Sequence, residues 1–473
     1  MFAFIKITMS TVDEKWKLNV KTSKSAALIF TVTTKSVRGS KHKLIKKVFP
    51  RPEFVEGMPL RIGETDFYRK RISDIKGVEY EKKVYAQIQR ELINTRKCGY
   101  FVGGPSPKVS SSADITYNFL VEKLGGRKNE SVLLESLFNI VYRTRNNSSA
   151  DAALVRDAAR TREGDIGAVM GAFRLFNFSQ LTTNYVPNHV SLADFIGTGL
   201  ITTTVSSSSP CRSVARCSIR DYPDLAKVVF QVLVGCFALG TRRIESNDLH
   251  DQNVLVQTVP MHSARCIVKS RAAGGKTLVD VTFNTSHKAL IFDWDFAHSS
   301  KIGKNEKLND SGFCKMVHDC NSIVDLVPDK QKVRTSILRN MVVVVAWLSY
   351  CARPSSRTTT VMRDWARFLG LIMAIDSDEK RAVLQAVYRG TCISNIDGVA
   401  GSTPYVRAKT GPNDDPLGMG DKIKTGEFFL DPIIYAPGEV FKDPVEILQL
   451  LGSMIGGGAS TGASNLEANL VYA

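Results

Sequence analysis

The sequence predicts a mixed α+β protein whose strands come early and whose helices dominate later. Residues 25–34 and 43–49 are rich in apolar and β-branched side chains, as strands are, and the polar segment 36–40 between them is typical of a turn. Residues 223–240 are apolar on nearly every side, with a proline at the first position and a glycine at the last. This pattern predicts a buried helix with matched ends.

A further helix is expected over residues 77–88, because apolar residues recur there at helical spacing. They are Val78, Val84, Tyr85 and Ile88. Glu81 stands within this apolar stripe, where an acid needs a cation. Strand 43–49 offers Lys46 and Lys47, which alternation sends to opposite faces, and Lys47 is preferred because it shares its face with two apolar residues. The alternative is a solvated Glu81 whose helical neighbours pair with each other.

Residues 100–175 are predicted to form an insertion with helices over 131–145 and 150–162. Five arginines make it basic: Arg143, Arg145, Arg156, Arg160 and Arg162. No aromatic residues alternate with them as in a platform that stacks nucleic-acid bases, so binding of nucleic acid through this basic surface has no motif behind it. After the insertion, an extended segment from Leu181 leads through a Pro/Asn turn into a helix capped by Ser191.

Two polar loops adjoin apolar, strand-like segments later in the chain. The first acidic loop (residues 246–253) places Asp248 and Asn253 five residues apart, and the second acidic loop (residues 292–297) holds Asp293 and Asp295 directly after an apolar run. Phosphoryl transfer needs such groups. One Asp orients an acceptor hydroxyl, and an Asn with a further Asp holds divalent metal on the phosphates.

These loops resemble known motifs. Asp248-Leu-His-Asp-Gln-Asn253 resembles the catalytic loop D-L-x-x-x-N of the protein-kinase-like superfamily, in the variant shared by aminoglycoside phosphotransferases and the atypical serine/threonine kinases of large DNA viruses such as iridoviruses. Asp293-Trp-Asp295 resembles the metal-binding D-F-G. The resemblance implies a two-lobed fold with a small antiparallel β-sheet lobe and a mainly helical lobe. It also implies ATP and Mg²⁺ as cofactors, with Asn253, Asp293 and Asp295 as metal ligands.

The resemblance also implies roles for residues outside the two acidic loops. Lys47, or Lys46, holds the phosphates with Glu81 behind it, and His250 stands where it contacts the transferring phosphoryl group. The remaining nucleotide contacts are Ser25, Ala26, Ala27 and Tyr185. The first three replace the usual glycine-rich loop with small residues, and the last lies in the hinge whose backbone contacts adenine.

The chain departs from the protein-kinase pattern after the buried helix. Ser246 and Asn247 replace the usual His and Arg, which removes the receiver of an activation-loop phosphate, so we expect activity without activation-loop switching. No A-P-E-like segment follows, and Asp325 is expected to brace the first acidic loop. Between the two acidic loops we expect a hairpin of 254–259 with 277–283.

The predicted organisation has three parts: residues 1–186 as the N-lobe with its insertion, 187–451 as the C-lobe, and 452–473 as a flexible Gly/Ala/Ser tail. The C-lobe helices are expected over 332–351, 360–375 and 378–389. No apolar run long enough for a membrane span is expected.

The composition indicates which partners and which compartment suit the protein. The net charge of +17 favours anionic partners, and nine cysteines spread from Cys98 to Cys392 fit reduced thiols in a cytoplasmic compartment. The resemblance to the kinases of large DNA viruses, which this charge fits, implies a serine/threonine protein kinase with a protein substrate, packaged in a virion beside capsid proteins. One alternative is a catalytically silent capsid or scaffold protein. The other is a small-molecule phosphotransferase, for which the charge is less natural.

Overall fold

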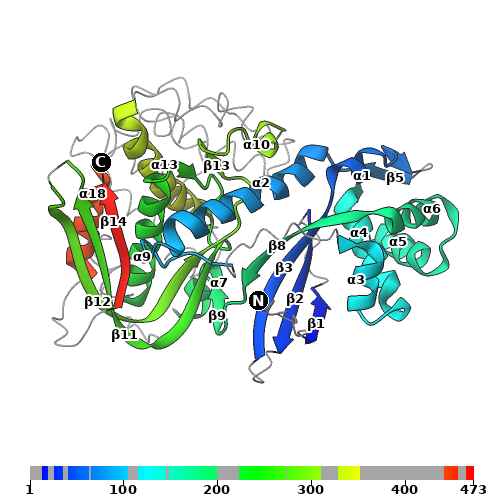
Figure 1. The fold of residues 1–473 in the computed structure, drawn as a ribbon, viewed down its shortest axis with the longest axis horizontal. Helices are drawn as coiled ribbons and strands as arrows, with labels where there is room; N and C mark the ends of the chain where they lie inside the picture. The colour runs from blue at the N-terminus through cyan, green and yellow to red at the C-terminus, as the bar shows by residue number, and fades with distance from the viewer. Residues whose placement is uncertain are drawn as a thin grey trace, which may run out of the picture. The chain divides into compact units, whose positions relative to one another are not determined.

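The computed structural model describes eleven stretches of the chain: residues 13–19, 26–35, 41–62, 65–104, 115–144, 149–199, 223–272, 274–310, 329–351, 442–455 and 465–472. The mixed α+β class is confirmed, with antiparallel sheets and helices (Figure 1). Contacts divide the chain into two compact units. The first unit holds Met1–Lys82 and Gly103–Tyr185, and the second holds Lys83–Val102 and Val186–Ala473. The first unit ends at Tyr185, and Lys83–Val102 belongs with the second unit.

The first unit is built on a five-stranded antiparallel sheet. In spatial order its strands are β1 (Asp13–Leu18), β2 (Leu28–Lys35), β3 (Lys41–Pro50), β8 (Asn177–Asn184) and β6 (Ile115–Thr116). β2 and β3 match the two predicted strands. β1 was not predicted, because it is mostly charged and only Trp16 and Leu18 are apolar.

Helices and short strands complete the first unit's core. They are α1 (Pro52–Glu56), β4 (Arg61–Ile62), β5 (Thr65–Arg69), α3 (Tyr117–Lys123), η2 (Arg127–Asn129), α4 (Glu130–Val141), β7 (Tyr142–Thr144), α5 (Ser149–Thr161), α6 (Gly164–Ala172) and η3 (Phe173–Leu175). The helix expected over 131–145 ends early, because β7 pairs with β5. Buried Glu130 accepts hydrogen bonds from Tyr117, Arg162 and Arg174, so part of the insertion's basic charge is neutralised internally.

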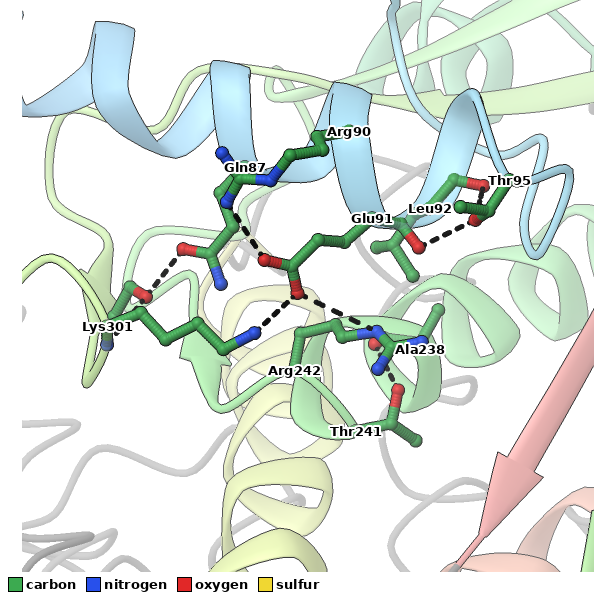
Figure 2. A network of polar contacts seen from close by, with 10 residues as sticks. Gln87, Arg90, Glu91, Leu92, Thr95, Ala238, Thr241, Arg242 and Lys301 are labelled. Carbon is green, nitrogen blue, oxygen red and sulfur yellow. Dashed lines mark hydrogen bonds and ion pairs between the residues drawn. The ribbon is translucent and has the colours of Figure 1, made fainter.

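Helix α2 (Ile72–Ile88) is followed directly by the π-helix η1 (Gln89–Ile93), and the residues from Lys83 onward belong to the second unit. Figure 2 shows how η1 is held. Glu91 lies 2.8 Å from Nζ of Lys301, 3.0 Å from Arg90 and 4.0 Å from Arg242, and Gln87 accepts a 2.7 Å hydrogen bond from Ser299. These contacts tie the end of α2 to the segment that follows the second acidic loop.

The second unit contains the predicted buried helix. Its elements are β9 (His189–Ser191), α7 (Leu192–Gly199), α9 (Pro223–Gly240), β10 (Ile244–Glu245), β11 (Val254–Ser270), β12 (Thr277–Ile291), β13 (His298–Ser299), α10 (Glu306–Asp310), α13 (Asp329–Cys351), α18 (Pro444–Ile455) and β14 (Asn465–Tyr472). α9 packs against α13, α18 and β12 (Figure 1). Gly240 allows the close approach, because a Cβ there would lie 2.4 Å from the backbone of Ile337.

Among the described residues, α9 alone is long and apolar enough to cross a membrane, and 83% of that stretch is buried inside the structure. Burial to this extent is typical of the core helix of a globular unit. The sequence prediction had overlooked this helix as a candidate span.

Two predictions about the second unit's strands are wrong. The hairpin between the acidic loops is longer than expected, because β11 and β12 pair from Val254 opposite Ile291 to Lys269 opposite Thr277. The tail is not flexible throughout, because β14 pairs in parallel with β11 from Asn465 to Tyr472. The expected helices over 360–375 and 378–389, Asp325 and Ser25 lie outside the described residues.

Candidate active site

Lys47 and Glu81 form an ion pair within the first unit. Nζ of Lys47, on β3, lies 2.6 Å from Oε1 of Glu81, on α2, and the glutamate side chain is 2% exposed. The helical stripe expected around Glu81 is buried as well: Val78, Val84, Tyr85 and Ile88. The predicted pairing is therefore present, while the role of the pair on phosphates stays a prediction.

Lys46 is engaged elsewhere. Its ammonium lies 3.4 Å from Oε1 of Glu14 and 4.3 Å from the ring centroid of Trp16. Burial lowers the pKa of Lys46, although Glu14 opposes the shift. Because strand alternation places the two lysines on opposite faces, Lys46 does not share the surroundings of Glu81. We keep Lys47 and not Lys46 as the candidate for binding phosphates.

Other predicted nucleotide contacts flank this sheet. Ala26 and Ala27 end the connection between β1 and β2, and Ala27 is buried. The N–H of Tyr185 donates to the carbonyl of Lys43 at 3.3 Å, and the Lys43 ammonium lies over the tyrosine ring. Ser191 caps α7, as predicted, by accepting a 3.0 Å hydrogen bond from the N–H of Asp194.

The base of the β11–β12 hairpin brings the two acidic loops of the second unit together. Val254 pairs with Ile291, so the residue before β11 lies beside the residue after β12. The carbonyl of Asn253 accepts a 3.1 Å hydrogen bond from the N–H of Phe292. Antiparallel pairing therefore places Asn253 next to the start of the second acidic loop, whatever their separation in sequence.

Asp293 has an unusual backbone conformation. Its φ is 69°, which is uncommon for residues other than glycine and marks a local constraint. The N–H of Asp293 donates to the hydroxyl of Tyr85 at 3.2 Å. The neighbouring Trp294 is fully buried and contacts the rings of Tyr85 and Phe101. The tryptophan thus anchors the second acidic loop against the last turns of α2 and the segment that follows η1.

Within the first acidic loop, Asn253 and Asp248 are in direct contact. Nδ2 of Asn253 donates to the carbonyl of Asp248 at 2.8 Å and lies 3.5 Å from its Oδ2. Nε2 of His250 lies 3.8 Å from the same carboxylate oxygen. Burial lowers the pKa of His250, but hydrogen bonding to Asp251 and the charge of Asp248 outweigh it, so the pKa is raised.

The pKa of Asp248 lies near neutral pH. Burial raises the pKa of Asp248 to about 7, and the carboxylates of Asp295 and Asp293 add to the rise, while His250 and Lys307 oppose it. Desolvation together with neighbouring like charge is the arrangement that shifts a carboxylate into the range useful for proton transfer.

Lys307 was missed by the sequence analysis. Its ammonium forms an ion pair with Oδ2 of Asp295 and lies 4.0 Å from the ring centroid of Phe296. Asn305, just before α10, donates to the carbonyls of Asp295 and Ala297 at 2.9 and 2.8 Å. A lysine twelve residues beyond an acid gives no local signal, so only the fold reveals this contact.

The donor set suits a hard cation. Asn253, Asp293 and Asp295 supply amide and carboxylate oxygens, which Mg²⁺ prefers, and the Lys307 ammonium shows that the site attracts positive charge. In the described part of the chain, no group of three His, Cys, Asp or Glu side chains is close enough to hold a metal by itself. Mg²⁺ commonly takes further ligands from water and phosphate oxygens.

Residues of α13 brace the first acidic loop. The side chain of Asn340 accepts a 2.8 Å hydrogen bond from the N–H of Ser246 and donates one of 2.8 Å to the carbonyl of Ile244. Arg339 forms a buried ion pair with Glu245. An Arg-Asn pair between apolar residues within a predicted helix is a sequence signal for such a role, and it was overlooked in favour of Asp325.

No protein-family model matches the sequence, and no curated protein is significantly similar to it. Among solved structures, the crystal structure of a Plasmodium kinase domain is similar over 90% of this chain and 91% of that domain, with 11% sequence identity and a TM-score of 0.31. A TM-score of this size does not establish a shared fold, so the function of the chain has to be inferred from the geometry of the two acidic loops.

Proposed function

We propose that the chain is an ATP-dependent phosphotransferase with a two-lobed, protein-kinase-like fold, which transfers a phosphoryl group to serine or threonine hydroxyls of proteins. The observation that carries this proposal is the base of the β11–β12 hairpin, where Asn253 contacts both Asp248 and the backbone at Phe292. An acid, an amide and a second acidic loop thereby converge as phosphoryl transfer requires.

Asp248 would accept the proton of the acceptor hydroxyl. Its raised pKa brings it near the operating pH, where a general base is most effective. Asn253 holds the backbone of Asp248 through its amide. His250, whose pKa is also raised, would place positive charge beside the reacting groups.

Asn253, Asp293 and Asp295 would hold Mg²⁺. Bound ATP and Mg²⁺ supply the phosphoryl group and neutralise its charge. Lys47 would bind phosphate oxygens, and the buried carboxylate of Glu81 would fix the position of its ammonium. Ala26, Ala27 and Tyr185 remain proposed nucleotide contacts.

The proposal extends to the kind of kinase and its source. The His250 variant of the loop and the net charge of +17 support a kinase of a large DNA virus that is packaged in virions and acts on protein substrates. Cys98, Cys236 and Cys266 are buried free thiols, which supports a reducing, cytoplasmic compartment.

One observation favours a second candidate, a catalytically silent relative that serves as a scaffold. The Lys307 ammonium forms an ion pair with the Asp295 carboxylate. In a relative that binds no metal, such a pair would neutralise this carboxylate permanently.

Thermal unfolding with and without Mg-ATP, followed by γ-phosphate transfer to one basic and one acidic protein, separates the two candidates. The phosphotransferase is stabilised by Mg-ATP and transfers phosphate, and Asp248→Asn reduces transfer about 10³-fold. The variant, purified in the same way, controls for contaminating kinases. Absence of both stabilisation and transfer would contradict the phosphotransferase and favour the silent candidate.

A further inference from the structure

Asn247, directly before Asp248, has a left-handed backbone. Its φ is 53°, a region that asparagine and glycine tolerate better than other residues. The side chain is buried. The resemblance to the protein-kinase catalytic loop indicates only which residue Asn247 replaces, whereas the structure shows what its side chain contacts.

The Asn247 side chain joins the two acidic loops. Its Nδ2 donates to the carbonyl of Phe296 at 3.1 Å, and Phe296 directly follows Asp295. β10 and β13 pair Ile244 with Ser299 and Glu245 with His298, so two further steps in the same register would set Asn247 opposite Phe296. The backbone at Asn247 is left-handed and no longer follows the strand. The Asn247 side chain therefore makes the hydrogen bond to Phe296 that a continued β-ladder would make.

A buried ion pair determines how the Asn247 amide is oriented. Nη2 of Arg339 lies 3.5 Å from Oδ1 of Asn247, and Nη1 pairs with Glu245. Because Oδ1 accepts from the guanidinium, Nδ2 is left to donate to Phe296. The side chains of Glu245 and Arg339 are 1% and 4% exposed, so water does not compete for these bonds.

We propose that Asn247 is a positioning residue that sets the separation between the first and second acidic loops, and that the Glu245–Arg339 pair orients its amide for this purpose. Its role in transfer rests on the proposed function. Asn305 donates to the carbonyls of Asp295 and Ala297, so with Asn247 the side-chain amides of two residues bind three successive carbonyls of the second acidic loop. A small displacement of such a loop costs up to about 100-fold in rate.

Three variants separate this role from a general effect on folding. Asn247→Gly keeps the left-handed backbone and removes the bridge, and Asn247→Asp keeps the side-chain shape but cannot donate to the Phe296 carbonyl. Arg339→Lys keeps a cation for Glu245 but loses the fork that reaches Asn247. Asn188→Gly is the matched control, because Asn188 has a φ of 49° and lies in neither acidic loop.

The first measurement is amide hydrogen exchange over residues 292–299 without nucleotide. We expect exchange at least 10-fold faster in both Asn247 variants, a smaller increase in Arg339→Lys, and no change in Asn188→Gly or over β2 and β3. Wild-type exchange in both Asn247 variants overturns the proposal, whatever the activity. If the wild type transfers no phosphate, the proposed function fails and exchange alone decides whether Asn247 holds the loop.

The second measurement is steady-state transfer as a function of Mg²⁺. We expect kcat to fall about 10- to 100-fold in Asn247→Gly and Asn247→Asp and the Mg²⁺ requirement to rise, with the KM for the protein substrate unchanged. Faster exchange with an unchanged kcat and Mg²⁺ requirement would show that the bridge is structural only, and it would overturn the positioning role.

Discussion

Two neighbouring groups of polar residues in the second unit differ in how their charges are balanced. The brace (Glu245, Arg339 and Asn340) pairs a buried carboxylate with a buried guanidinium. The acidic cluster (Asp248, Asp293 and Asp295) gathers carboxylates, and burial raises the pKa of Asp248 to about 7. The paired charges of the brace hold a loop in position. The excess of negative charge in the acidic cluster instead favours the binding of protons and cations.

The largest effect is expected from Asp248→Asn, which should reduce transfer about 10³-fold because the general base is lost. Wild-type transfer should rise with pH through about 7, as the Asp248 carboxylate ionises. A rate–pH profile that stays flat between pH 5.5 and 8.5 would contradict the assignment.

The same variant should stabilise the fold at high pH. The folded-state pKa of Asp248 is raised, so the ionised form destabilises the fold; this penalty is absent below the ordinary aspartate range, grows as pH rises and is complete above about pH 7. The Asp248→Asn substitution should therefore raise the free energy of unfolding at pH 8 by on the order of 1–3 kcal/mol and give no gain at pH 4. Urea denaturation at both pH values measures this difference.

The brace should behave in the opposite way. Arg339→Met leaves Glu245 buried without its guanidinium and should lower the free energy of unfolding by about 3–5 kcal/mol, whereas Glu245→Gln combined with Arg339→Met should cost much less. A double-mutant cycle by urea denaturation gives the coupling. Arg265→Gln, which breaks an exposed pair with Asp280, is the control. A loss in the double variant equal to the sum of the losses in Arg339→Met and Glu245→Gln alone would show that the pair is not coupled.

Asn340→Ala tests the brace without altering charge. It removes two hydrogen bonds to the backbone around β10 and should lower the free energy of unfolding by about 1–3 kcal/mol, because Ser246 N–H and the Ile244 carbonyl are left in a buried setting. Transfer should fall together with stability. A stable variant with wild-type transfer would remove Asn340 from the brace.

The smallest effect is expected at Lys307. If its ammonium competes with metal at Asp295, Lys307→Gln should lower the Mg²⁺ concentration needed for half-maximal transfer by about two- to fivefold, as befits a partly exposed ion pair. Titration of Mg²⁺ at fixed ATP checks this. A higher Mg²⁺ requirement would instead mean that Lys307 assists the reaction.

Much of the local structure could be predicted from the sequence. The stripe around Glu81, the buried helix Pro223–Gly240 and the Ser191 cap were recognised, because periodicity and capping are properties of neighbouring residues. Strand β1 escaped notice since its apolar face consists of two residues. The tail was assigned flexibility from its small residues, yet β14 pairs with β11 because that strand offered a free edge.

By itself, the sequence determined which chemical groups the two acidic loops carry and that Lys46 and Lys47 lie on opposite faces of their strand, because residue type and alternation are local. The structure decided that Lys47 is the one that pairs with Glu81. Only the tertiary structure decided that Val254 lies opposite Ile291, that Arg339 reaches Glu245 across 94 residues, and that Asn247 bridges to Phe296. Such contacts depend on which distant segments pair and in what register, and burial then sets the strength and pKa of the groups they bring together.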